Sequence, residues 1–205
     1  MSQPGIPAIR VWATSDRAKA RMRRLCAMVS GRFGFIETRD APDFVFCMNM
    51  DHSVLRFPGV RIQIIGENIL PDFNLVDYAI GFDRLTLGDR YLRWPLLRAW
   101  PSYASLHQRM PFEEIAKDRN EFCACVVSNT TNRQGALDAY LDCFSKYRQV
   151  RCGGRWRNNV GGRVADKLAF LRQHKFSFAF ENTSYPGYVT EKITDAFAAG
   201  TIPIY

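Results

Sequence analysis

The sequence of 205 residues predicts an α/β protein whose strands form parallel sheets. Short apolar runs alternate along the chain with longer amphipathic segments, which is the pattern of strands joined by crossover helices. The same plan occurs twice, before and after a stretch that contains Pro101, Pro111 and charges of both signs. We therefore expect an α/β domain over residues 1–100, a linker over 101–120, and a second α/β domain over 121–205.

The individual elements follow from the spacing of the apolar residues. A basic amphipathic helix is expected over 16–30, and the second half is expected to hold helices over 133–147 and up to Leu171. The expected strands cover residues 9–14, 33–36, 44–48, 60–65, 77–82 and 122–128, with another near Val150.

Residues 176–205 are the most informative part of the chain. Phe176, Phe178 and Phe180 alternate with small residues, which predicts a strand that ends at Glu181 and Asn182. A turn-forming stretch follows, then a helical period from Tyr188, then Gly200 as a helix terminator, and finally a short apolar strand over 201–205. This β-loop-α-β unit places its loop at the carboxyl edge of a parallel sheet, where such sheets bind ligands.

Two stripes run along the predicted helix of this unit. The apolar stripe, which we expect to face the core, consists of Val189, Ile193, Ala196 and Phe197. The polar stripe consists of Tyr188, Glu191, Lys192 and Asp195. By pattern alone the polar stripe could be a solvated face. The position of Lys192 favours function, because the helix dipole disfavours a cation in the first turn unless an anion is bound there.

The composition is that of a globular protein with an anionic partner. Hydrophobic residues make up 47% and charged residues 23% of the chain, and the net charge is +8 with a pI near 9.4. Such a charge suits a nucleotide, a phospholipid surface or a nucleic acid. Nucleic-acid binding is the least favoured of these, because the chain lacks an aromatic-rich platform and zinc-ligand spacing.

Other features limit the class of protein further. The chain has no run of about 18 apolar residues, and its start has no basic region followed by an apolar stretch. Neither a transmembrane helix nor a signal peptide is therefore expected. The six cysteines show no C-x-x-C spacing, so free thiols in a reducing compartment are expected rather than zinc ligands or disulfides.

The segment 176–205 resembles the donor-binding signature of the α1,3/α1,4-fucosyltransferases, glycosyltransferase family 10, in their bacterial form. Further stretches are similar to the same family in order and spacing. They are residues 66–68, 72–75, 77–82, 90–93, 127–129 and 153–158, together with Arg133.

The resemblance implies a GT-B-like fold, in which two Rossmann-like α/β halves face a cleft. It also implies inverting transfer of L-fucose from GDP-fucose to a hydroxyl of an acceptor glycan that contains N-acetylglucosamine or glucose. No metal or other cofactor is expected besides the co-substrate GDP-fucose, and the chain has no Asp-x-Asp motif to hold a metal on the diphosphate. The family signature continues beyond the position of Tyr205, so the second half is expected to be incomplete and the chain to be a fragment.

A cytoplasmic location is expected from the free thiols and the lack of a signal peptide, and the family's C-terminal tail implies peripheral membrane attachment as a further expectation. The sequence does not reveal which oligosaccharide or glycoconjugate is the acceptor. The alternative function is a non-catalytic module of the same fold that binds a nucleotide or a partner chain.

Glu67 is the candidate catalytic base. It follows the predicted strand 60–65 at its carboxyl end, and it matches the carboxylate proposed as the base in bacterial relatives. An inverting displacement needs such a base to take the proton of the acceptor hydroxyl. The alternative is a loop glutamate held by backbone amides.

Five residues are candidates for binding the donor. Arg133 and Lys192 stand at predicted helix starts and match residues that hold the diphosphate in the family. Asn182, Tyr188 and Glu191 match positions that contact the ribose, phosphate or fucose. Glu191 could instead orient Lys192, and the sequence does not separate these roles.

Overall fold

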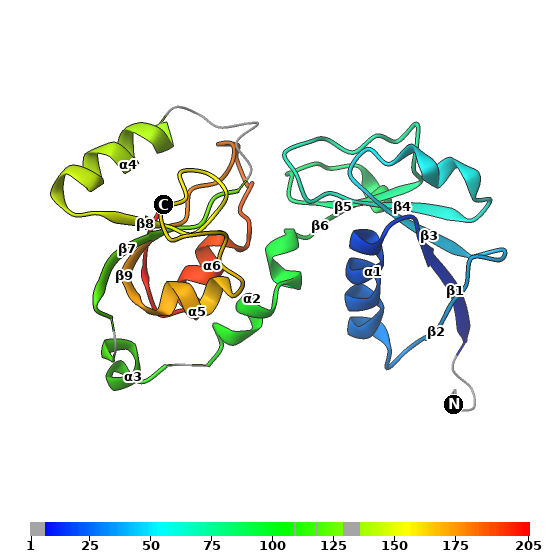
Figure 1. The fold of residues 1–205 in the computed structure, drawn as a ribbon. Helices are drawn as coiled ribbons and strands as arrows, with labels where there is room; N and C mark the ends of the chain where they lie inside the picture. The colour runs from blue at the N-terminus through cyan, green and yellow to red at the C-terminus, as the bar shows by residue number, and fades with distance from the viewer. Residues whose placement is uncertain (1–6, 109, 118, 129–135) are drawn as a thin grey trace. The chain divides into compact units, whose positions relative to one another are not determined.

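The computed structural model describes residues 7–205 except 109, 118 and 129–135. The chain divides into two compact units, Met1–Ala99 and Trp100–Tyr205 (Figure 1). Each unit is built around its own parallel sheet, so the predicted α/β class is confirmed.

The first unit has a six-stranded sheet in the order β2-β1-β3-β4-β5-β6, and every neighbouring pair is parallel. The strands are β1 (Ala8–Ala13), β2 (Gly34–Glu37), β3 (Phe44–Met48), β4 (Val60–Ile64), β5 (Tyr78–Gly81) and β6 (Tyr91–Arg93). The helices are α1 (Asp16–Val29) and three short 3-10 turns, η1 (His52–Arg56), η2 (Gly88–Arg90) and η3 (Leu96–Ala99).

The alternation of side chains along β3 creates a core on each face of this sheet. Phe46 packs with Met22 of α1 on one face, whereas Val45 and Cys47 pack with Val54 of η1 on the other. The helix begins where Ser15 accepts a hydrogen bond from the amide of Ala18 at 3.3 Å. Both faces of the sheet are therefore covered, as parallel sheets require.

The second unit has a four-stranded parallel sheet in the order β10-β9-β7-β8. The strands are β7 (Glu121–Cys125), β8 (Val150–Cys152), β9 (His174–Phe178) and β10 (Ile202–Ile204). The helices are α2 (Pro101–Ser105), α3 (Phe112–Ala116), α4 (Ala136–Tyr147), α5 (Lys167–Arg172) and α6 (Glu191–Ala198).

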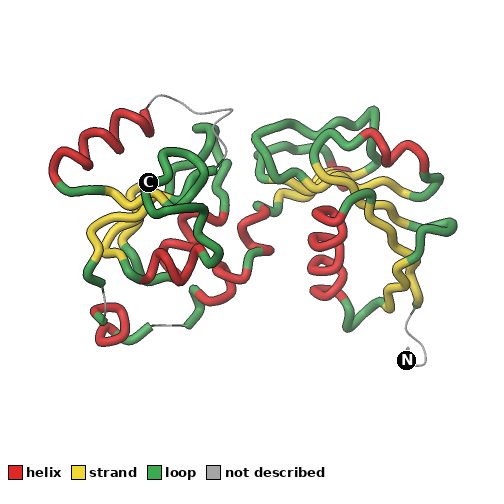
Figure 2. Tube along the Cα trace, in the orientation of Figure 1, coloured by secondary structure: helices red, strands yellow, loops and turns green. Residues whose placement is uncertain are grey.

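Helices cover both faces of this second sheet as well. Cys123 and Cys125 of β7 pack with Leu141 of α4 on one face, and Ala124 between them packs with Leu171 and Ala199 on the other. Figure 2 shows the yellow strands of this unit with red helices on both sides, α4 on one and α5 and α6 on the other. The carboxyl edge of the sheet carries the loops that are described below.

Residues 101–120 form more structure than the predicted linker. Pro101 is the first residue of α2, where a proline suits the helix start instead of breaking the helix. The hydroxyl of Ser102 lies 3.0 Å from that of Thr194 in α6, and both residues are buried. This stretch therefore packs within the second unit.

The predicted helix of the signature begins later and turns a different face to the core. Gly187 has φ of 87°, and the amide of Tyr188 donates to Tyr185 in a turn, so the helical period starts only at Glu191. Phe197, predicted to face the core, is 50% exposed, whereas Asp195 of the polar stripe is buried. The burial of Asp195 follows from its ion pair with Lys167, a partner 28 positions away that the helical period could not reveal.

His174 is a buried titratable group of the second sheet. It is 1% exposed, its Nδ1 lies 2.8 Å from the carbonyl of Phe170, and Glu121 and Arg151 are the nearby charges. Burial penalises the imidazolium and holds the pKa of His174 below its ordinary value. The unfolded chain therefore takes up a proton at a higher pH than the folded one does.

We expect this histidine to destabilise the fold as the pH falls. The free energy of unfolding should decline below about pH 6.5 with a slope of up to ~1.4 kcal/mol per pH unit from this group. Urea unfolding of the wild type and of His174→Gln between about pH 7.5 and about pH 5.5 measures this contribution. The variant should show the shallower pH dependence; equal slopes would contradict the assignment.

Candidate functional site

The chain order of the second sheet reverses between β7 and β9. The strand that follows β7, β8, lies on one side of it, whereas β9 and then β10 lie on the other side. The chain therefore leaves the carboxyl ends of β7 and β9 toward opposite sides of the sheet. Parallel α/β sheets bind their ligands at such a switch point.

The loop after β9 is joined to the start of α6 by a group of polar contacts. Glu181 accepts hydrogen bonds from the Thr190 amide at 2.7 Å and from the Thr190 hydroxyl at 2.6 Å. The ammonium of Lys192 donates to Asn182 Oδ1 at 2.9 Å and lies 3.4 Å from Glu181 Oε2. These contacts hold a cation at the first turn of α6, beside the switch point.

The first turn of α6 keeps its backbone donors. Thr190 occupies the N-cap position, but its side chain makes no capping hydrogen bond, because its hydroxyl donates to Glu181. The first amides of a helix otherwise lack partners and carry the positive end of the dipole. This helix start, together with Lys192, can therefore bind an anion such as a phosphate.

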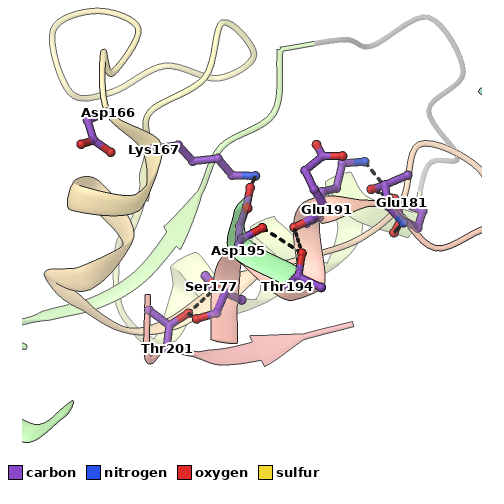
Figure 3. A network of polar contacts seen from close by, with 12 residues as sticks. Asp166, Lys167, Ser177, Glu181, Glu191, Thr194, Asp195 and Thr201 are labelled. Atoms are coloured by element: carbon purple, nitrogen blue, oxygen red, sulfur yellow. Dashed lines mark hydrogen bonds and ion pairs between the residues drawn. The ribbon is translucent and has the colours of Figure 1, made fainter. Parts of the chain in front are cut away.

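Further polar contacts fix the rest of α6 in place (Figure 3). The ammonium of Lys167, at the start of α5, lies 2.7 Å from Oδ2 of buried Asp195 on α6. The hydroxyl of Thr201 donates to the carbonyl of Ala196 at 3.1 Å and lies 2.8 Å from that of Ser177 in β9. Within the polar stripe, Asp195 is buried and Lys192 is held by Glu181 and Asn182. The interpretation of this stripe as a solvated face is therefore wrong.

The structure places the predicted donor residues as follows. Asn182 and Lys192 are in direct contact, Tyr188 is buried in the turn before α6, and Glu191 is the first residue of α6. The carbonyl of Glu191 accepts from the Thr194 hydroxyl at 3.0 Å. Arg133 lies outside the described residues.

The loop after β8 lies next to the same edge. Its backbone continues the pairing with the chain after β7, since the amide of Trp156 donates to the Val127 carbonyl at 3.0 Å. A Cβ at Gly154 would collide with that carbonyl, so glycine is required there. Asn158 closes the loop by donating to the carbonyls of Gly154 and Gly162 at 2.7 and 2.9 Å, so its amide has a structural role.

Glu67 lies in the first unit, after the carboxyl end of β4. Buried Gln63 donates to the Asn49 carbonyl at 2.7 Å and accepts from the Asp72 amide at 3.1 Å, while Asn49 Oδ1 accepts from Gly66 at 3.0 Å. These bonds shape the loop on both sides of Glu67, whose side chain is exposed. Among the residues that the structure describes, its carboxylate accepts no hydrogen bond, so backbone amides do not hold it there.

Sequence reasoning missed the residues that hold the site in place. Glu181 was expected only as the end of a strand, and Gln63 was not singled out. A signal existed for Glu181, because it stands beside Asn182 at a strand end and Thr190 precedes a charged first turn. No local pattern could have found Lys167, whose partner is set by tertiary packing.

Other possible sites in the described part of the chain do not involve these residues. A groove of about 1140 Å³ lies among α2, α3, α5 and α6, and none of the predicted site residues lines it. Within the described ranges, no group of three or more His, Cys, Asp or Glu side chains could hold a metal ion. None of the described helices combines the length and apolar character needed to cross a membrane.

Comparison with known proteins identifies the family. Residues 9–100 match the N-terminal domain of alpha-(1,3)-fucosyltransferase FucT, and residues 116–205 match the C-terminal part of glycosyltransferase family 10 (fucosyltransferase). The chain is 37% identical over 177 residues to the alpha-(1,3)-fucosyltransferase FucT of Helicobacter pylori. That match covers 71% of this chain and 37% of the relative, so the chain spans little more than a third of the relative's length.

Solved structures agree with this result. A crystal structure of alpha1,3-fucosyltransferase with GDP-fucose matches with a TM-score of 0.77 and 31% identity, and covers all of this chain and 70% of the other. The structure of such an enzyme with GDP matches with a TM-score of 0.74 and 29% identity over the same shares. The fold is thus that of the GT-B fucosyltransferases, as the sequence predicted. The chain belongs to glycosyltransferase family 10, the fucosyltransferases.

Proposed function

We propose that this protein transfers L-fucose from GDP-fucose to a hydroxyl of an acceptor glycan, with inversion at the anomeric carbon. The observation that carries the proposal is the cationic start of α6 at the β7/β9 switch point, where Lys192 contacts Asn182. The similarity to an alpha1,3-fucosyltransferase crystallised with GDP-fucose supports the choice of donor. The family's acceptors point to a glycan that contains N-acetylglucosamine or glucose.

The second unit binds the donor in this proposal. Lys192 and Arg133 neutralise the diphosphate, which becomes the leaving group, and the first amides of α6 add donors. Asn182, Tyr188 and Glu191 contact the ribose, phosphate or fucose. Glu191 is the first residue of α6 and follows Thr190, which Glu181 holds, so its backbone position is fixed independently of its side chain.

The first unit supplies the base. Glu67 takes the proton of the acceptor hydroxyl as that oxygen attacks the anomeric carbon. Its place after β4 and the bonds that Gln63 and Asn49 make around its loop support this role. An exposed carboxylate that accepts no hydrogen bond from the described residues is available to a substrate hydroxyl.

Basic side chains carry the charge of the leaving group, so the reaction requires no metal and no cofactor besides GDP-fucose as co-substrate. The protein acts in the cytoplasm, with peripheral membrane attachment as an extension of this proposal, and nucleic acid is not a partner.

The donor assignment predicts transfer from GDP-fucose and none from UDP-galactose. The intact protein that contains residues 1–205 is incubated with each radiolabelled donor and with an N-acetyllactosamine acceptor, and the product is separated from the donor. Transfer from UDP-galactose with none from GDP-fucose would reject the assignment. GDP binding without any transfer would favour the non-catalytic nucleotide-binding module.

Glu67→Gln should lower turnover by roughly 100-fold or more while GDP-fucose binding is retained, because the amide cannot accept the proton. Turnover is measured with acceptor present, and binding is measured by calorimetry. Glu113→Gln, at another exposed glutamate on α3, serves as the control and should behave as the wild type. Near-normal turnover of Glu67→Gln would remove this residue from the mechanism.

Lys192→Ala and Arg133→Ala should each weaken the binding of GDP and of GDP-fucose. A charge-assisted phosphate contact is worth about 1.5–3 kcal/mol, so the loss should be roughly 10- to 150-fold for each residue. Both side chains address one dianion, so the double variant should depart from additivity. The affinities should be unchanged by EDTA, and unchanged GDP affinity in Lys192→Ala would contradict the proposal.

A further inference from the structure

We propose that Glu181 is a positioning residue for the donor diphosphate: it holds the Lys192 ammonium and the start of α6 in the arrangement that binds the anion. This inference rests on the proposed function. Glu181 itself touches protein groups, whereas Lys192 is the group that addresses the ligand.

Glu181 uses both carboxylate oxygens for this purpose. Oε1 accepts from the Thr190 amide at 2.7 Å, and Oε2 accepts from the Thr190 hydroxyl at 2.6 Å and lies 3.4 Å from Lys192 Nζ. A single side chain thus fixes both the backbone at the N-cap of α6 and the cation two residues later. Charge-assisted hydrogen bonds of this kind are the strong ones in proteins.

The arrangement leaves one donor of Lys192 for a ligand. The ammonium has three N–H groups, and its contacts in the described structure are those with Asn182 Oδ1 at 2.9 Å and Glu181 Oε2 at 3.4 Å. Two contacts restrict the rotation of a side chain that is otherwise flexible. The third N–H can then reach a phosphate oxygen without a further loss of side-chain entropy.

The carboxylate of Glu181 is buried, and a buried charge beside an anion site needs a physical reason. The side chain of Glu181 is 6% exposed and that of Lys192 is 16% exposed. A buried anion next to a site for an anionic ligand opposes binding by repulsion, and it is costly to desolvate unless it is paired. The carboxylate is consistent with a binding site only if the order that it gives to Lys192 and α6 outweighs this repulsion.

The ion pair of Lys167 with Asp195 provides a matched comparison. It also ties α6 to the body of the unit, at 2.7 Å, and Asp195 is similarly buried. Figure 3 shows Lys167, at the start of α5, reaching Asp195 on α6, whereas Glu181 lies beside the start of α6. Within the described residues, neither member of this pair forms a hydrogen bond or ion pair with Lys192, so the loss of the pair should affect stability and leave the diphosphate contact intact.

Calorimetry with GDP tests the role of Glu181 in the intact protein. The set comprises the wild type, Glu181→Gln, Lys192→Ala, the Glu181→Gln/Lys192→Ala double variant and Asp195→Asn. Glu181→Gln keeps the size of the side chain and removes its charge, and it should weaken GDP about tenfold. In the Lys192→Ala background the same change should weaken GDP by clearly less than in the wild type, because the part of its effect that acts through the lysine is already lost and only the part that acts through the start of α6 remains.

Asp195→Asn should lower the melting temperature without changing GDP affinity. Glu181→Asp, which keeps the charge but cannot reach both partners, should weaken GDP less than Glu181→Gln does, and it provides the same readout if the glutamine variant does not fold. Equal or tighter GDP binding by folded Glu181→Gln would overturn the proposal. So would an equal loss in the wild-type and Lys192→Ala backgrounds, or an equal loss in Asp195→Asn.

The result for the wild type separates the two claims. Absence of GDP binding by the wild type would overturn the proposed function and this inference with it. Normal GDP binding by the wild type with no effect of Glu181→Gln would overturn only the role of Glu181.

Discussion

The attachment of the first turn of α6 to the end of β9 is the constraint on which the second unit's site depends. Glu181 provides it through the amide and hydroxyl of Thr190 and through Lys192. Because the Thr190 hydroxyl is engaged in this way, it does not cap the helix, and the first amides keep their capacity to bind an anion. One buried carboxylate thereby determines where the backbone donors and the cation lie.

In the first unit, uncharged side chains fix the backbone around the candidate residue. Buried Gln63 in β4 bonds to the Asn49 carbonyl and the Asp72 amide, and Asn49 bonds to the amide of Gly66. Glu67 thus stands in a loop whose backbone is fixed on both sides while its own carboxylate remains exposed. In both units, polar residues behind the candidate group are buried, and the group itself lies past the carboxyl end of a parallel strand.

The sequence predicted most strands and both parallel sheets, because the apolar pattern of buried strands and the shift to a helical period are local signals. It did not predict α2, because Pro101 resembles a helix breaker when its place at the first turn is unknown. The exposure of Phe197 and the burial of Asp195 could not be predicted, since Lys167 is a tertiary partner. Candidate residues were found through resemblance and position, whereas Glu181 and Gln63 emerged only from their contacts.

The central claim is that GDP binds at the start of α6. Hydrogen exchange with and without GDP tests it most directly, because it shows which backbone amides are protected when the nucleotide binds. We expect slower exchange in peptides that cover residues 179–193 and 126–128, which follow β9 and β7 at the switch point, and no change in peptides from the α2, α3 and α5 side of the groove among α2, α3, α5 and α6. Protection confined to that groove or to the first unit, with unchanged exchange at the start of α6, would contradict the claim.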